Sequence, residues 1–262
     1  MRLALVGSWR TPFLATAALG FVIAALAVFM LPPLTIHLDQ AKTSGPGPSF
    51  RELFERPIVL MSFVMTAVTM MSGFMVIPNI SSYVQYNLAY PREHLEILYL
   101  SGGTVSFFAL RLVGRLVDRY GSFKVGTVGS ALVLGVMYSG FAMVPPPIPI
   151  VAVFVLFMTA MSFRNVAYNT LTSKVPSPAE RARFMSLQSA VQHSASAFGA
   201  VLSSRMLTET PSHHLVGLPS VIYVSMGLTI ILPVLLWVVE RSLNQAAIPS
   251  KNLQAPTEPV AS

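Results

Sequence analysis

Long blocks of apolar residues alternate with short polar stretches along this chain. A helix needs about 20 apolar residues to cross a hydrocarbon core about 30 Å thick. Seven blocks reach or approach that length, and they cover residues 11–33, 57–86, 96–119, 125–144, 150–172, 183–204 and 216–239. The pattern predicts an all-α membrane protein with seven transmembrane helices.

The polar stretches divide the chain into four predicted parts. Residues 1–33 carry the first helix, and residues 34–56 form a linker rich in Gly, Pro and Ser. The linker ends in a short amphipathic segment that suits a helix lying on the membrane surface. Residues 57–240 hold six helices as a half-bundle. The polar, proline-containing tail at 241–262 is predicted to be disordered and cytoplasmic.

Lys and Arg mark one side of the predicted bundle. Cytoplasmic loops of membrane proteins are enriched in these residues. One side receives Lys42, Arg51, Arg56, Arg111, Arg115, Arg119, Lys124, Lys174, Arg181, Arg183, Arg241 and Lys251. The other side receives Arg2, Arg10, Arg92 and Arg205. We therefore expect a multi-pass protein of the plasma (inner) membrane, with its N-terminus outside and its C-terminus in the cytoplasm.

Composition agrees with a membrane protein and narrows its chemistry. Hydrophobic residues make up 53% of the chain and charged residues 10%, whereas soluble domains carry about 25% charged residues. The absence of cysteine excludes disulfides and thiolate metal sites. The net charge of +7 is attributed to cytoplasmic loops and not to a nucleic-acid partner. No predicted span carries a paired-carboxylate, Ser–His or metal motif, so we expect no enzyme, cofactor or metal site.

Strongly polar residues are confined to four of the predicted helices. Such residues are costly in a bilayer, so they tend to face a cavity or a partner helix. The candidate cavity-lining residues are Asn79, Gln85, Arg111, Arg164, Asn165, Asn169, Gln188, Gln192 and His193. The first, fourth and seventh helices carry only Ser, Thr and Tyr. This distribution predicts a bundle that encloses a central path.

Two of these residues have alternative interpretations. Arg164 lies deep in its predicted helix, where it could contact a substrate in a watery cavity or form a structural hydrogen bond to helix carbonyls. His193 could carry a proton or act as a neutral hydrogen-bonding group.

Two helices also show packing patterns. Small residues at Ala195, Gly199 and Ser203 recur every four positions and predict close helix approach. The helix at 57–86 is rich in methionine, which predicts adaptable packing or an apolar surface for varied ligands.

The segment Gly114–Lys124 reads Gly-Arg-Leu-Val-Asp-Arg-Tyr-Gly-Ser-Phe-Lys and resembles the loop motif of the major facilitator superfamily. That motif is G-x-x-x-D-[RK]-x-G followed by a pair of basic residues. This chain keeps the pair only in part, as Lys124. The candidate gating residues are Gly114, Arg115, Asp118, Arg119, Gly121 and Lys124. The resemblance implies contacts that hold one conformational state and break in another, with Asp118 near a helix start and Arg119 paired with a carboxylate. The alternative is a solvated basic turn.

The resemblance also implies a register for the helices. In the family this loop lies between the eighth and ninth helices in its second copy. The helix at 11–33 then resembles the sixth helix, the linker resembles the central loop, and the half-bundle resembles helices seven to twelve. We therefore expect a truncated C-terminal portion that lacks an N-terminal half.

The resemblance implies transport of a small solute by alternating access, as part of a full-length transporter. We expect proton coupling and efflux of amphipathic compounds, with the lipid bilayer, the solute, the proton and the missing N-terminal half as partners. Two alternatives stay open. One is an inactive truncated fragment, and the other is a seven-helix receptor or sensor, which an external N-terminus would also suit.

Overall fold

Helices make up almost all of the structure. The computed structural model describes residues 10–30, 50–143 and 145–252. The chain divides into two units, residues 1–47 and 48–262, and each is considered by itself.

The first unit contributes one described helix, α2 (Thr11–Met30). Its 20 residues are apolar on all sides, carry no charge and include no buried residue. A helix that is hydrophobic all round is typical of a membrane span or of a buried core helix, and its length of 20 residues matches a bilayer crossing. The prediction at 11–33 is confirmed for residues 11–30. Residues 31–33 and the linker up to residue 49 lie outside the described residues.

The second unit contains the remaining helices. It begins with the short helix α4 (Phe50–Phe54), in the predicted amphipathic segment, and Leu53 of α4 is fully buried. The longer helices are α5 (Pro57–Val76), α7 (Leu95–Tyr120), α8 (Ser122–Met137), α9 (Ile150–Thr172), α10 (Arg181–Met206) and α11 (Leu218–Asn252). A two-stranded antiparallel ribbon, β1 (Thr208–Glu209) and β2 (Leu215–Val216), joins α10 to α11. A short 3₁₀ turn, η3 (Arg92–His94), precedes α7.

Two of the predicted spans continue beyond their regular helices. After α5 the chain passes through η1 (Ile77–Asn79), α6 (Ile80–Ser82) and the π-helical turn η2 (Tyr83–Asn87). Pro78 lies in η1, where a proline cannot donate the i→i−4 hydrogen bond of a regular α-helix. α8 ends similarly in a π-helical turn, η4 (Tyr138–Ala142).

Six described helical stretches are long and apolar enough to cross a membrane. They are Thr11–Met30, Pro57–Asn87, Arg92–Tyr120, Ser122–Ala142, Ile150–Thr172 and Leu218–Gln245. The predicted span at 183–204 is present as the 26-residue helix α10, which is more polar than the other long helices. The all-α membrane fold is therefore confirmed, and a membrane crossing by α10 stays a prediction.

The C-terminal boundary differs from the expectation. The predicted disordered tail began at residue 241, but α11 continues to Asn252. Leu243 packs against a buried cluster that includes Leu236 and Val239, and this contact favours continuation of the helix. Residues 253–262 lie outside the described residues.

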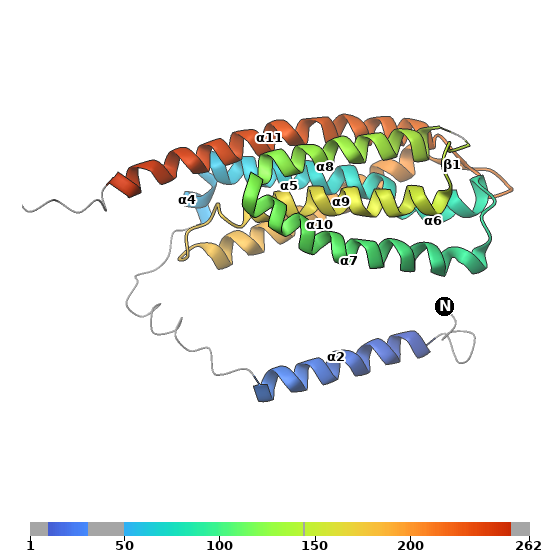
Figure 1. The fold of residues 1–262 in the computed structure, drawn as a ribbon, viewed down its shortest axis with the longest axis horizontal. Coiled ribbons are helices and arrows are strands. Elements are labelled where there is room, and N and C mark those ends of the chain that lie inside the picture. The colour runs from blue at the N-terminus through green and yellow to red at the C-terminus, as the bar shows by residue number, and fades with distance from the viewer. Residues whose placement is uncertain (1–9, 31–49, 144, 253–262) are drawn as a thin grey trace, which may run out of the picture. The chain divides into compact units, whose positions relative to one another are not determined.

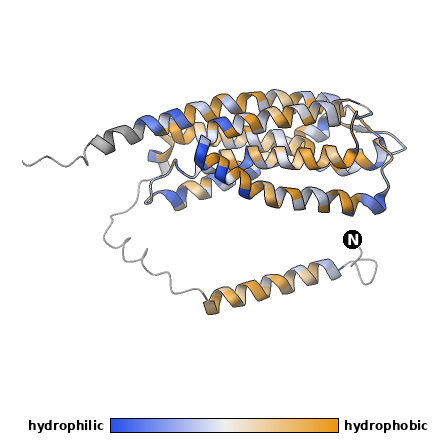
Figure 2. Ribbon diagram, viewed as in Figure 1, coloured by the Kyte–Doolittle hydropathy of each residue, from blue (hydrophilic) through white to orange (hydrophobic). Residues whose placement is uncertain are grey.

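The long helices of the second unit lie roughly parallel or antiparallel, as Figure 1 shows. α5 packs against α10 and α11, while α9 packs against α7 and α8. Apolar residues dominate the middle of the helices, and hydrophilic residues gather toward their ends (Figure 2). The second unit is therefore a helical bundle with an apolar band, as a bilayer requires.

The predicted row of small residues on α10 lies at a close helix crossing. A Cβ atom placed on Gly199 would lie 2.6 Å from the backbone oxygen of Met71 in α5. One turn further, Asn79 Nδ2 donates a hydrogen bond to Ser203 Oγ at 2.7 Å. The prediction of close approach is confirmed, and the partner helix is α5.

A buried carboxylate ties two loops together at one end of this unit. Glu180, just before α10, is 4% exposed and forms an ion pair with Arg56, just before α5. The Ser177 backbone N–H also donates to Glu180 Oε1, at 2.8 Å. Burial acts to raise the pKa of Glu180, but these bonds outweigh it and hold that pKa below its ordinary value of 4.5. Arg56 and Glu180 thus join the start of α5 to the start of α10.

We predict that Gly199→Ala destabilises the protein by about 1–3 kcal/mol, because the added methyl group forces α10 away from α5. Thermal unfolding in detergent, followed by circular dichroism, measures the change. Gly103→Ala is the matched control, since a Cβ atom there meets nothing within 4 Å. Gly103→Ala should leave the melting temperature unchanged or raise it, because alanine has a higher helix propensity than glycine. Equal effects of the two substitutions would contradict the close crossing.

We predict that Glu180→Gln destabilises the protein by about 1–3 kcal/mol at neutral pH, because Arg56 loses its charged partner. A lowered pKa means that the stabilisation is present above the ordinary value of 4.5 and is lost as pH falls through the lowered pKa. The difference in melting temperature between wild type and variant should therefore shrink below pH 4.5. Glu55→Gln, in the exposed pair of Arg51 and Glu55, should have little effect at either pH. A pH-independent difference for Glu180→Gln would count against the ion pair.

Candidate functional site

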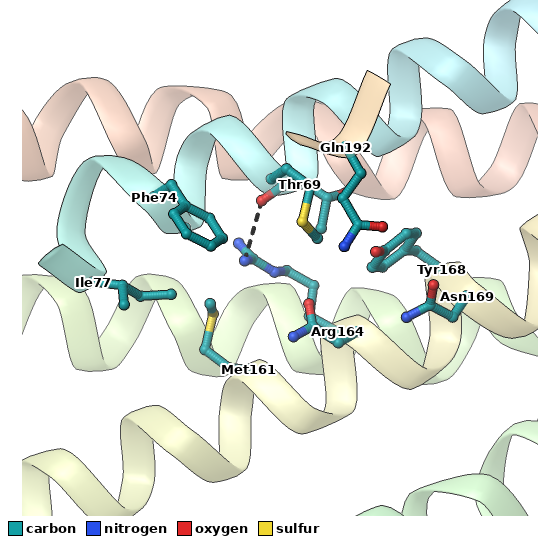
Figure 3. A pocket seen from close by; sticks show the side chains of 11 residues that line it. Thr69, Phe74, Ile77, Met161, Arg164, Tyr168, Asn169 and Gln192 are labelled. Atoms are coloured by element: carbon teal, nitrogen blue, oxygen red, sulfur yellow. Dashed lines mark hydrogen bonds between the residues drawn. The ribbon is translucent and has the colours of Figure 1, made fainter. Parts of the chain in front are cut away.

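A cavity of about 260 Å³ lies between α5, α9 and α10. Figure 3 shows the side chains that line it, with Arg164 near its centre. They are Thr69, Met70, Gly73, Phe74, Ile77, Met161, Arg164, Asn165, Tyr168, Asn169 and Gln192. Polar and apolar side chains share the lining, which is unusual for the interior of a membrane bundle.

Arg164 is the charged residue among the side chains that line the cavity. It is 1% exposed, and its guanidinium extends from α9 toward α5. Nη1 donates to Ser72 Oγ at 2.9 Å, and Nη2 donates to the Thr69 carbonyl at 3.4 Å. The Nε donor is buried without a hydrogen-bond partner. Arg164 therefore combines a structural bond to α5 with a place in the cavity wall, so the two interpretations of this residue are compatible.

Two glycines make room for this arginine, and Ser72 connects it to a further helix. A Cβ atom on Gly73 would lie 3.2 Å from Nη2 of Arg164, and one on Gly129 in α8 would lie 2.7 Å from the Arg164 backbone nitrogen. The Ser72 carbonyl also accepts a 2.6 Å hydrogen bond from Ser225 Oγ of α11. The Arg164 guanidinium thus lies at a polar connection that links α9, α5 and α11.

Four of the predicted cavity residues are brought together. Arg164, Asn165, Asn169 and Gln192 all line the cavity. Gln188 is buried one turn before Gln192, and its Oε1 lacks a hydrogen-bond partner, but it does not line the cavity. Asn165 Oδ1 is likewise buried without a partner.

The other predicted cavity residues lie elsewhere. Asn79 is held by Ser203, and Gln85 Nε2 donates to the Ser81 carbonyl at 3.1 Å. Arg111 is exposed on α7, with its guanidinium carbon 5.2 Å from the centre of the Phe107 ring. His193 is exposed on α10. These four residues do not line the cavity.

The sequence prediction missed two polar residues of the cavity lining. Thr69 of α5 and Tyr168 of α9 line the cavity, and neither was singled out. A signal was present, because Ser62, Thr66, Thr69 and Ser72 recur at three- and four-residue spacing and are all buried. Their hydroxyls donate to carbonyls three or four residues earlier, which lets a membrane helix carry a polar face at low cost.

The loop motif forms a tight turn between α7 and α8. Gly121 adopts φ +89°, which favours glycine, and its N–H bonds to the Val117 carbonyl at 2.9 Å. Glu240 of α11 then accepts hydrogen bonds from the backbone N–H groups of Ser122 (3.0 Å) and Phe123 (2.8 Å). A carboxylate at a helix N-terminus satisfies free N–H groups and complements the helix dipole. Glu240 therefore fixes the turn, a role that the sequence prediction did not assign.

The charged residues of the motif point outward. Asp118, Arg115, Arg119 and Lys124 are exposed. The Arg119 guanidinium carbon lies 5.3 Å from the centre of the Tyr120 ring. Within the described residues neither Asp118 nor Arg119 forms an ion pair, and the N-terminus of α8 is capped by Glu240 in place of Asp118. Hydrogen bonds hold the backbone of the turn, and its charged side chains are exposed for other contacts.

Residues 2–200 match the family model described as Major Facilitator Superfamily. No curated protein matches the chain. The family match covers well over half of the chain, and it includes the loop at Gly114–Lys124 and the cavity residues on α5, α9 and α10. The match, the membrane-length helices and the loop agree, and the chain therefore belongs to the major facilitator superfamily, a family of membrane transporters.

Proposed function

We propose that this protein carries a small solute across the membrane by alternating access, with the cavity around Arg164 as the solute site. The observation that carries the proposal is a mixed polar and apolar cavity lined by a buried arginine. Intramembrane ionisable residues usually mark substrate or ion pathways. Because family members are membrane transporters and not enzymes, a transport site is the simplest use for this arrangement.

The α7–α8 turn is proposed to act as a gate contact. Glu240 holds the turn in place, while Asp118 and Arg119 are exposed at its surface. Such groups can bond to a second helical half in one state and separate from it in the other. We propose that helices corresponding to the N-terminal half of the family fold supply this surface and the opposite cavity wall.

Proton coupling is proposed to use His193. Histidine is the side chain that most readily changes charge near neutral pH. His193 follows the cavity residue Gln192 on α10 and is exposed on the bundle. Because His193 is the sequence neighbour of Gln192, proton binding to its imidazole is proposed to act on the solute site through α10, with efflux as the proposed direction.

The orientation proposed from the basic residues places the α7–α8 turn in the cytoplasm of a plasma (inner) membrane. The loop between α9 and α10, with Lys174 and Arg181, lies on the same side by this argument. A receptor or sensor does not account for the family match. An inactive fragment would share the topology tested first but would not show the alternating access tested second.

The first prediction concerns orientation. The chain contains no cysteine, so Pro147→Cys and Ser173→Cys each create a single exposed thiol. A membrane-impermeant maleimide added to intact cells should label the thiol at position 147 and leave that at 173 unlabelled until the membrane is opened. Labelling of both thiols from the same side would overturn the proposed topology.

The second prediction concerns alternating access. Single cysteines at two cavity residues, Asn169→Cys and Ile77→Cys, are introduced into the chain assembled with the proposed N-terminal helices and are labelled in right-side-out and inside-out vesicles. The thiol at position 169 should react faster from the cytoplasmic side, and that at 77 faster from outside. Asp118→Asn should shift the ratio of the two rates by about fivefold or more, as expected if a gate contact is lost.

The control for this experiment is Glu93→Asn, an exposed carboxylate near the other end of the bundle, which should leave the ratio unchanged. Labelling rates that do not respond to Asp118→Asn would remove the α7–α8 turn from the mechanism. If the thiols at positions 77 and 169 both react from the same side of the membrane and from that side alone, alternating access is refuted.

A further inference from the structure

Arg164 carries a positive charge that no carboxylate among the described residues neutralises. None of the described carboxylates lies within ion-pair distance of it, and its described partners are a hydroxyl and a carbonyl. Among the described acidic residues, Glu96 and Asp118 lie in the terminal turns of α7, and Glu240 of α11 is bound to the backbone of the α7–α8 turn. A buried arginine without a counter-ion is costly, and a bound anion would offset that cost.

The hydrogen-bonding capacity of this site is also only partly used. A guanidinium has five N–H donors in a planar fork that matches a carboxylate. One of the two observed bonds is long, at 3.4 Å, and Nε has no partner. The amides of Asn165 and Gln192 line the same cavity and can supply further donors.

Part of the cavity wall is apolar. Met70, Phe74, Ile77 and Met161 line it, and in Figure 3 Phe74, Ile77 and Met161 lie on one side of the Arg164 guanidinium. Arg164 is the one Lys or Arg among the lining residues. A ligand with two or more negative charges would therefore leave charge unpaired, while a neutral apolar ligand would leave the arginine unpaired.

We propose that the cavity binds an amphipathic monocarboxylate, with its carboxylate on Arg164 and its apolar body against Met161, Phe74 and Ile77. The inference rests on the proposed use of this cavity as a solute site and specifies the solute's chemistry. The cavity volume of about 260 Å³ suits a small aromatic or short aliphatic acid. Thioether and aromatic side chains form an adaptable surface for such a body.

The test measures binding without transport. The purified chain in nanodiscs of zwitterionic lipid is dialysed against radiolabelled benzoate, with benzamide and benzylamine as competitors of nearly the same shape. Benzoate should bind about tenfold more tightly than benzamide or benzylamine, as expected for charge-assisted hydrogen bonds. Equal affinities for benzoate and benzamide in the wild-type chain would overturn the inference.

Variants assign the preference to the arginine. Arg164→Gln should reduce the ratio of benzoate to benzamide affinity to about one, and Arg164→Lys should retain part of it. Arg205→Gln, at the exposed C-terminal end of α10, is the matched control and should leave the ratio unchanged. A preference for benzoate that survives Arg164→Gln in a folded sample would place the anion site elsewhere.

A second measurement leaves Arg164 intact in case its variants fail to fold. Benzoate should slow alkylation of Gln192→Cys about tenfold at saturating ligand, and benzamide at the same concentration should not. Equal protection by the two ligands would refute the carboxylate assignment. Failure of alternating access is detected separately by the thiols at positions 77 and 169, so the two proposals can fail independently.

Discussion

The contact between Arg164 and α5 is the interaction on which the arrangement of this bundle depends. A buried guanidinium in a membrane-length helix must find acceptors within a few ångströms, and the nearest are Ser72 Oγ and the Thr69 carbonyl. The guanidinium therefore ties α9 to α5, and Gly73 of α5 leaves room for it, while Gly129 lets α8 approach α9 at Arg164. Ser225 extends the same connection to α11.

The two ends of the bundle are fixed by different means. At one end Glu180 and Glu240 bind loop N–H groups, and Glu180 also binds Arg56. At the other end the Asn87 side chain forms two 2.9 Å hydrogen bonds with the backbone of Leu215 in β2. Because its middle and both ends are held by specific bonds, the bundle suits rigid-body rocking better than internal rearrangement, as the proposed alternating access requires.

Sequence patterns predicted the helices well because bilayer thickness sets their length. The helix predicted at 150–172 has the same bounds in the structure. The extension of α11 depends on the packing of Leu243, which hydropathy does not show. Arg164, Asn165, Asn169 and Gln192 line one cavity. Arg111 and His193 do not line it, because polarity reveals that a residue needs a partner but does not give the rotation of its helix.

The same limit explains why α10 is informative. Its mean hydropathy is too low for it to be recognised as a membrane span, yet it packs closely on α5 at Gly199. Its buried side carries Gln188 and its exposed side carries His193. An exposed polar face on a helix within an apolar bundle is unfavourable against lipid and favourable against water or a second polar surface. This distribution supports the proposed solute path along α10, next to Arg164, which has no counter-ion among the residues that the structure describes.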